Sequence, residues 1–306
     1  MKQFLLILLP VILLINNAAA QGTATDWFNK GVKLNDSARH SAAVTAYERA
    51  IALDANYSDA YYRLGWTYNE LAVYDKAIEK LIKALDLKKT DAFSMQELGY
   101  AYNKKGNYIE ALNYLNKAIY QKPDYARAYK QLGDAYGGLK RNTEAITAYE
   151  KAYSLNNKDE GACYQAGYLY NATEKYELAL SWLNKAVAIK PTVSAYNEMG
   201  FANYKLLKND EAFAGYKNAL LINPKNGTAY KGMGDVYRRN FKPAKTTEAI
   251  EQYKKAVMYN PKSSGSYFGL GWCYNETQNY DSAIANLKKA SELDPKLTAA
   301  FTELGY

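Results

Sequence analysis

The sequence contains very little histidine and cysteine. Its 306 residues include one histidine, His40, and two cysteines, Cys163 and Cys273. A single histidine excludes a metal site built from several imidazoles, and it excludes a histidine-dependent catalytic triad anywhere away from His40. No glycine-rich phosphate loop follows a strand-like segment. We therefore predict a protein that is not an enzyme and that binds no metal and no cofactor.

Long apolar segments are scarce as well. The segment from Phe4 to Ile15 has 12 residues, with Pro10 among them, whereas a membrane-spanning helix needs ~20 apolar residues. Lys2 precedes this segment and Ala18–Ala20 follow it, which is the pattern of a secretory signal peptide. We predict that residues 1–20 are a signal peptide cleaved after Ala20, and that the mature protein is periplasmic or secreted. A retained membrane anchor is the alternative interpretation.

The chain also lacks a concentrated block of one charge. Its formal net charge is +8, from 39 basic and 31 acidic residues, and the lysines are scattered rather than gathered in a stripe. Scattered charges are typical of solvated helix faces, so we predict no nucleic-acid binding. The net charge weakly favours acidic partners.

A glycine that recurs with a nearly constant period dominates the chain. Six of its eight intervals are 34 residues long, one is 33 and one is 37. The recurring glycines are Gly31, Gly65, Gly99, Gly133, Gly167, Gly200, Gly234, Gly271 and Gly305. A fixed period of this length indicates a solenoid of one repeated supersecondary unit. Cys163 and Cys273 lie three repeats apart, too far for a disulfide, whose Cα atoms lie within ~7 Å.

Residues 92–125 show how one repeat is built. Apolar and small residues fall at helical spacing in two segments of this repeat. The first contains Met95, Leu98, Gly99 and Tyr102, and the second contains Tyr108, Ala111, Leu112, Leu115, Ala118 and Ile119. Gly106 separates the segments and Pro123 follows the second, and both residue types interrupt helices. Each repeat is therefore predicted to be two antiparallel helices joined by tight turns.

The recurring glycine is expected to lie inside the first helix of each repeat. Glycine in a helix costs ~1 kcal/mol relative to alanine. Because every complete repeat accepts this cost at the same place, we expect a helix–helix contact too close for a Cβ atom. Most of the 31 tyrosines are expected to pack in the core around that contact.

These residues resemble the signature of the tetratricopeptide repeat family. In the second repeat the matching residues are Tyr61, Leu64, Gly65, Tyr68, Tyr74, Ala77 and Ala84. The closing prolines of the family correspond to Pro123, Pro191, Pro224, Pro261 and Pro295. The resemblance covers residues 24–306. It implies an all-α fold, an α-solenoid of tandem antiparallel helix pairs in a right-handed superhelix. It also implies that the first helices line a concave groove in which proteins or peptides bind.

The expected domain organisation follows the period. Residues 1–20 are the signal peptide, residues 21–297 hold eight repeats, and residues 298–306 supply the first helix of a ninth. The eight repeats are expected at residues 24–57, 58–91, 92–125, 126–159, 160–192, 193–226, 227–263 and 264–297. Solenoids need a terminal element with a polar outer face, which residues 298–306 do not supply. We therefore expect the protein to continue past Tyr306 or to dock its last helix on a partner.

The candidate site is the stripe of the first helices beside their core stripe. This stripe is rich in aromatic residues, whereas a solvated helix face is normally polar. Its predicted binding residues are Tyr62, Trp66, Tyr100, Tyr164, Tyr168, Phe201, Phe268 and Trp272, with the charged pairs Lys130/Asp134 and Lys231/Asp235. One step further along the helix lie Asn69, Asn103, Asn171 and Asn275. Their amides can both donate to and accept from an extended peptide backbone.

Each part of this site also has a structural interpretation. The aromatic residues are suited to packing between repeats, asparagine is favoured near helix C-termini, and exposed i,i+4 charge pairs are usually solvated. The family's clamp for a C-terminal carboxylate pairs a lysine with an asparagine one turn later. Here Asp134 and Asp235 follow the two lysines, so that clamp is not supported.

We predict a non-enzymatic scaffold of the bacterial cell envelope that holds a protein or an extended peptide in the concave groove. An envelope assembly partner is one such ligand, and no integral membrane segment remains after signal cleavage. One alternative is a glycan-binding adaptor, because aromatic rings also suit sugar faces. Another alternative is the substrate-presenting region of a longer enzyme, such as a peptide glycosyltransferase, whose catalytic domain lies outside this sequence.

Overall fold

The computed structural model describes residues 22–241 and 243–305, so the predicted signal peptide, residues 1–20, lies outside the described residues. The described part contains 17 helices and no strand. The prediction of an all-α fold is therefore confirmed. No helix among the described residues is long and apolar enough to cross a membrane.

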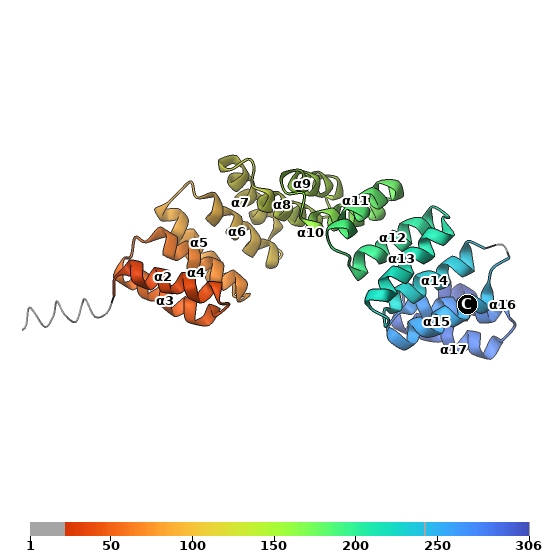
Figure 1. Cartoon of the computed structure of the whole chain (residues 1–306). Helices are drawn as coiled ribbons and strands as arrows, with labels where there is room; N and C mark the ends of the chain where they lie inside the picture. Colours follow the sequence, from red (N-terminus) through yellow and green to blue (C-terminus); the bar gives the residue numbers. More distant parts are fainter. Residues whose placement is uncertain (1–21, 242, 306) are drawn as a thin grey trace, which may run out of the picture. The chain divides into compact units, whose positions relative to one another are not determined.

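The chain folds into two compact units, and the N-terminal unit ends at Asn156. Its first helices are α2 (Ala24–Asp36), α4 (Ser58–Glu70), α6 (Ala92–Lys104) and α8 (Ala126–Gly138). Its second helices are α3 (His40–Leu53), α5 (Tyr74–Leu87), α7 (Tyr108–Gln121) and α9 (Asn142–Leu155) (Figure 1). Each first helix packs antiparallel on the second helix that follows it, as the sequence pattern predicts.

The C-terminal unit begins at Asn157. Its first helices are α10 (Glu160–Ala172), α12 (Val193–Lys205), α14 (Gly227–Arg239), α16 (Ser264–Glu276) and α18 (Thr298–Leu304). Its second helices are α11 (Tyr176–Ile189), α13 (Asn209–Ile222), α15 (Thr246–Tyr259) and α17 (Tyr280–Leu293). The one-residue shortening before α12 is absorbed at its start, where Thr192 caps the helix by accepting a hydrogen bond from the Ala195 amide at 3.2 Å.

Helices contact their neighbours in the same order within each unit. A second helix packs on the first helix of the next repeat, and successive first helices, such as α4 and α6 or α12 and α14, also contact one another. The first helices therefore form a continuous layer in each unit, and the second helices cover one side of that layer.

The recurring glycines lie where the two helices of a repeat approach most closely. A Cβ atom added at Gly133 would lie 2.7 Å from the ring of Tyr149, and one added at Gly167 would lie 2.7 Å from Leu183. Real Cβ atoms essentially never make contacts shorter than 3.0 Å. The expectation of a contact too close for a Cβ is confirmed for the eight complete repeats, because a buried tyrosine or leucine of the second helix fills the space above each of their glycines, whereas Gly305 has nothing within 4 Å.

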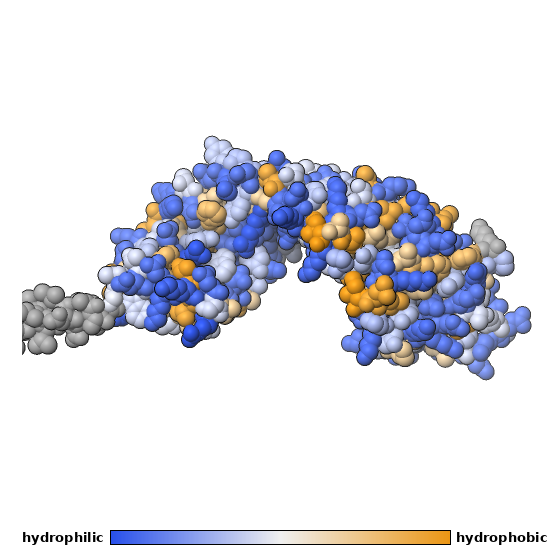
Figure 2. Space-filling model, in the orientation of Figure 1, coloured by the Kyte–Doolittle hydropathy of each residue, from blue (hydrophilic) through white to orange (hydrophobic). Residues whose placement is uncertain are grey.

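Polar side chains cover most of the visible surface. Figure 2 shows hydrophilic residues over the greater part of this face, with apolar residues in separate patches. Exposed large apolar side chains include Tyr120 and Leu221 on second helices and Tyr168 and Phe201 on first helices. Scattered apolar residues are normal on protein surfaces, so a binding site has to be argued from how particular residues are arranged.

Candidate functional site

The predicted aromatic residues of the N-terminal unit are half-buried between repeats. The Tyr62 ring lies 6.4 Å from Phe93 of the next repeat, and the Trp66 ring lies 6.2 Å from His40 of the preceding repeat. Tyr100 packs on the preceding repeat in the same way. Burial raises the pKa of Tyr62 to about 12. These three rings thus contribute mainly to packing between repeats, which is the structural interpretation of the stripe.

The C-terminal unit exposes two of its predicted rings. Tyr168 is 44% exposed and Phe201 is 36% exposed. The half-buried Tyr164 stacks on Tyr168, with ring centroids 6.4 Å apart. An exposed aromatic pair on adjacent first helices is a suitable wall for an apolar or cationic side chain of a ligand.

Phe268 and Trp272 are covered by a neighbouring cation. The guanidinium of Arg238 lies 5.5 Å from the Phe268 ring and 5.2 Å from the Trp272 ring. A guanidinium over an aromatic face is a stabilising cation–π contact. These two predicted binding residues are therefore already engaged by the chain itself.

The predicted asparagines bind the next repeat. The Asn69 amide donates to the Glu97 backbone oxygen at 3.1 Å and to its Oε2 at 2.9 Å. The Asn171 amide donates in the same way to Glu198, at 3.0 and 2.8 Å. The corresponding bonds elsewhere are Asn103 to the Gln131 backbone oxygen and Asn275 to Glu303. This corrects the expectation of free amide donors facing a ligand, because the fold already uses them to join successive repeats.

The two predicted charged pairs belong partly to the core. The Tyr149 hydroxyl donates to Asp134 Oδ1 at 2.7 Å, and the Tyr253 hydroxyl donates to Asp235 Oδ1 at 2.6 Å. Lys231 also pairs with Asp235, with 2.5 Å between Nζ and Oδ2, whereas Lys130 is half-buried beside Asp134. Burial raises the pKa of Tyr149, and Asp134 adds to that shift. Asp134 thus satisfies a buried phenol through one of its oxygens, and its place in a binding site stays a prediction.

Two glutamates that the sequence prediction missed accept the asparagine amides. Glu97 is 1% exposed, and burial raises its pKa above the ordinary value although Arg127 and Asn69 lower it. Burial also raises the pKa of the half-buried Glu198, against the hydrogen bond from Asn171. The sequence held a usable signal, because each glutamate follows its asparagine by 27 or 28 residues.

In the N-terminal unit this glutamate is paired with a cation from the next repeat. Arg127 of the next repeat lies 3.3 Å from Glu97 Oε1. Beside it, the Tyr125 hydroxyl donates to Gln96 Oε1 at 2.7 Å, and Gln96 Nε2 donates to Gln131 Oε1 at 2.7 Å. Asn69 Oδ1 and Asn103 Oδ1 nevertheless accept no hydrogen bond from the described residues, so the feature that sets this unit apart is the Arg127 guanidinium beside Glu97.

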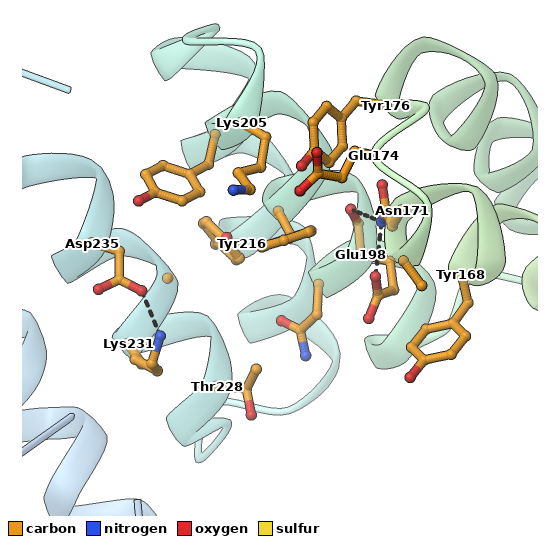
Figure 3. Close-up of a pocket in the computed structure, with 15 residues that line it drawn as sticks. Tyr168, Asn171, Glu174, Tyr176, Glu198, Lys205, Tyr216, Thr228, Lys231 and Asp235 are labelled. Carbon is orange, nitrogen blue, oxygen red and sulfur yellow. Dashed lines mark hydrogen bonds and ion pairs between the residues drawn. The ribbon is translucent and has the colours of Figure 1, made fainter. Parts of the chain in front are cut away.

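In the C-terminal unit the corresponding face opens into a groove of about 480 Å³. Residues of α10, α12 and α14 line it, among them Tyr168, Glu198, Phe201 and the Lys231–Asp235 pair. Figure 3 shows Asn171 and Glu198 joined by dashed bonds, and the Lys231–Asp235 pair joined on α14. The structure thus brings these predicted residues together around one space, and it adds Glu198 to them.

The residue types that often bind metals or act as nucleophiles have other surroundings in this structure. Among the described residues no group of three or more His, Cys, Asp or Glu side chains is placed to hold a metal ion. Burial raises the pKa of Cys163 to about 11 and that of Cys273 to about 12, so both are weak nucleophiles near neutral pH. His40 shares a 3.0 Å hydrogen bond with Asn35 Oδ1. Each of these groups has a structural role in the core or between helices.

Comparison with protein families gives one consistent result. Four tetratricopeptide repeat models match residues 46–79, 91–158, 160–192 and 241–303. A comparison with curated protein sequences gave no match.

Solved structures share the fold at low sequence identity. The C-terminal part of a TPR repeat-containing protein from Cytophaga hutchinsonii aligns with a TM-score of 0.64 and 16% identity, over 79% of this chain and 99% of that chain. A tetratricopeptide repeat protein from Parabacteroides merdae aligns with a TM-score of 0.60 and 17% identity, over 81% of this chain and 97% of that chain.

A third similar structure is the APC/C hetero-tetramer Cut9–Hcn1. It aligns with a TM-score of 0.61 and 18% identity over 87% of this chain. The present chain spans only 52% of the length of that matched chain. At these identities the three similarities concern the fold alone.

Proposed function

We propose that this chain, which belongs to the tetratricopeptide repeat family, is a non-enzymatic scaffold of the bacterial cell envelope that holds an extended peptide on its first helices. The family membership and the repeat architecture support a role in protein interaction. The C-terminal groove is the best candidate for the peptide site, because there the stripe of the first helices remains open.

The observation that carries the proposal is the combination of exposed rings and free acceptors in that groove. Tyr168 and Phe201 are the exposed members of the aromatic stripe. Asn171 Oδ1 and Asn197 Oδ1 are buried and accept no hydrogen bond from the described residues, and both asparagines line the groove. A buried polar atom without a partner costs ~1–3 kcal/mol. Backbone N–H groups of an extended peptide are the donors that such acceptors need.

The test is binding of a degenerate library of capped, extended peptides to the purified chain. Tyr168→Ala and Phe201→Ala should each weaken binding by ~2 kcal/mol, as exposed aromatic anchors do when removed. The matched control is Tyr120→Ala, because Tyr120 is 83% exposed on a second helix outside the groove. Thermal unfolding should be nearly unchanged in all three variants. Equal binding by the Tyr168 and Tyr120 variants contradicts the proposed site.

An array of soluble polysaccharide and peptidoglycan fragments, probed in parallel, addresses the glycan-binding alternative. The proposal expects no fragment to compete with the peptides. Selective binding of a fragment, lost in Tyr168→Ala, would assign the groove to sugars and reject the peptide proposal.

Export is proposed on the pattern of residues 1–20 alone. Expressed in a Gram-negative host, the protein should lose these residues and appear in the osmotic-shock fraction. Mass spectrometry of the N-terminus is the measurement. A cytoplasmic protein that retains Met1 contradicts export and with it the envelope role.

A further inference from the structure

We propose that the C-terminal groove selects peptides that carry a basic side chain, and that it seats the ammonium or guanidinium group against Glu198. This inference rests on the proposed peptide-binding function and adds the chemistry of the ligand. It stands on an internal comparison between two repeats, on the unpartnered acceptors of the groove and on its aromatic wall.

Glu97 and Glu198 hold the same place in their repeats. Each is the sixth residue of a first helix, and each accepts the amide of an asparagine from the preceding repeat. In the N-terminal unit the second residue of the next first helix is Arg127, whose guanidinium pairs with Glu97 at 3.3 Å. In the C-terminal unit the residue at that place is Thr228, which lines the groove (Figure 3).

Threonine brings no charge to its carboxylate. Glu198 therefore lacks the cation that Glu97 receives from its own chain, and the described residues place no Lys, Arg or His within ion-pair distance of it. A half-buried carboxylate without a counter-charge favours any cation that can reach it. Arg127 shows which group satisfies this kind of site within the same fold.

The other unsatisfied groups of the groove are also acceptors. Asn171 is 4% exposed, and both its Oδ1 and that of Asn197 lack a donor among the described residues. The same is true of Asn69 Oδ1 and Asn103 Oδ1 in the N-terminal unit, so it is the combination with the unpaired Glu198 that distinguishes the groove. A ligand therefore has to bring hydrogen-bond donors. Lysine and arginine side chains carry three and five N–H donors and no acceptor, so they match this set better than any neutral or acidic side chain.

The remaining charges of the groove either contact other groups of the chain or are exposed to solvent. Lys231 pairs with Asp235 at 2.5 Å, and Asp235 also accepts from Tyr253. The Lys205 ammonium lies 5.8 Å from the Tyr176 ring and 5.9 Å from the Phe201 ring. Glu174 lines the rim and is exposed. Glu198 is thus the half-buried charge of the groove that the chain leaves uncompensated.

The aromatic wall fits the aliphatic part of such a ligand. Tyr168 and Phe201 are exposed beside Glu198 on the adjacent helices α10 and α12. Lysine and arginine lay their methylene stems on apolar surface while the charged end stays with polar partners. A ring face near the cation adds a further attraction.

The experiment uses capped peptides with degenerate flanks and one fixed central residue, either arginine, lysine, citrulline or glutamate. Citrulline keeps the shape and most N–H donors of arginine but carries no charge. Fluorescence anisotropy at two ionic strengths should show arginine and lysine peptides binding about tenfold more tightly than citrulline peptides, with glutamate peptides weakest. The difference should shrink as salt rises.

Two variants test the seat of the cation. Glu198→Gln keeps the size and one acceptor for Asn171, and it should remove the preference for arginine over citrulline. Thr228→Arg should place a guanidinium where Arg127 lies in the N-terminal unit and should exclude basic peptides. Glu97→Gln, the matched control in the N-terminal unit, should leave the preference unchanged. Circular dichroism melts confirm that each variant is folded.

The outcomes separate the inference from the proposed function. Peptides that bind through Tyr168 with no preference for basic residues overturn the inference and leave the scaffold proposal standing. An unchanged preference in folded Glu198→Gln also overturns the inference. Absence of binding by every peptide overturns the peptide site, and the inference with it.

Discussion

The two units of the molecule use one structural element in two ways. In both, an asparagine near the end of a first helix donates to a glutamate on the next first helix. The N-terminal unit then covers the glutamate with Arg127, and the C-terminal unit places Thr228 there and leaves a groove. The shared hydrogen bond therefore belongs to the architecture of the solenoid. The second residue of the next first helix, Arg127 or Thr228, decides whether the carboxylate is paired within the chain or is available to a ligand.

The same distinction applies to the aromatic residues. Trp66 and Tyr100 of the N-terminal unit are half-buried against neighbouring repeats, whereas Tyr168 and Phe201, at the same place in repeats of the C-terminal unit, are exposed. Equivalent positions in sequence thus have different neighbours in space. A repeat signature alone identifies the stripe, and the neighbours of each ring decide whether it packs or binds.

The largest expected effect is a loss of stability that is confined to the N-terminal unit. Gly133→Leu should destabilise the N-terminal unit by ~3 kcal/mol, at the upper end of overpacking costs, because a side chain at Gly133 meets the buried ring of Tyr149 at 2.7 Å. Coupling in a solenoid is between nearest neighbours, so peptide binding by the C-terminal groove should persist. Urea unfolding followed by circular dichroism measures the loss.

Gly137→Ala is the control for this variant. Gly137 lies in the same helix, and an added Cβ would meet nothing within 4 Å. The substitution should therefore stabilise the protein by about 0.5–1 kcal/mol through helix propensity. Equal stability of the Gly133→Leu variant and the unmodified protein would disprove the close-contact explanation of the recurring glycines.

A smaller effect comes from exchanging the residues, Arg127 and Thr228, that distinguish the two units. Arg127→Thr should cost ~2 kcal/mol, below the range for fully buried pairs, because it leaves Glu97 without its cation while Arg127 itself is half exposed. Thr228→Arg should change stability by less than ~0.5 kcal/mol, since it adds a partner at an exposed position. Thermal and urea unfolding of both variants make the comparison. If both variants lost a similar free energy of unfolding, the carboxylates of Glu97 and Glu198 would not be distinguished by their partners.

Removing the acceptor of a buried phenol should have a still smaller effect. Asp134→Ala leaves the Tyr149 hydroxyl without its 2.7 Å acceptor and should cost ~1–2 kcal/mol. The double variant Asp134→Ala/Tyr149→Phe should recover part of that loss, because no buried donor then remains unpaired. A double-mutant cycle in urea gives the coupling energy. Strictly additive losses would show that the hydrogen bond is not the reason for the aspartate.

The smallest effect is a pH dependence of stability. Burial raises the pKa of Glu97 above the ordinary 4.5, since it outweighs Arg127 and the Asn69 hydrogen bond. A carboxyl with a raised folded-state pKa contributes stability that is fully present below its unfolded pKa and is lost as pH rises through the folded pKa. The free energy of unfolding of the unmodified protein should therefore fall by an amount on the order of 1 kcal/mol or less as pH rises from the unfolded pKa of this carboxyl to neutral pH. The Glu97→Gln variant should lack this fall. Parallel urea titrations across this pH range are the measurement, and identical slopes for the two proteins would contradict the assignment.

Much of the fold was predictable because its causes are local and repeated. The glycine period, the helical spacing of residues 92–125 and the prolines after the second helices lead to tandem helix pairs. The close contact at Gly133 was predictable too, since a glycine inside a helix needs a reason in packing. The candidate site was predictable only as a stripe. Asn69 was assigned to a ligand, because the 28-residue spacing to Glu97 becomes a signal only once successive first helices are known to lie in contact.

By itself the sequence determined the repeat, the helices and the positions whose side chains face the core, because these follow from periodicity and the shape of each residue type. The tertiary structure alone decided which polar groups find hydrogen-bond or ion-pair partners within the chain. Glu97 and Glu198 carry the same side chain and accept the same amide, but burial and pairing depend on the residue that the next repeat brings beside them. Hydrogen bonds and charges act over a few ångströms in space, so neighbours 27 to 30 residues away in sequence determine whether a predicted binding residue is free to bind.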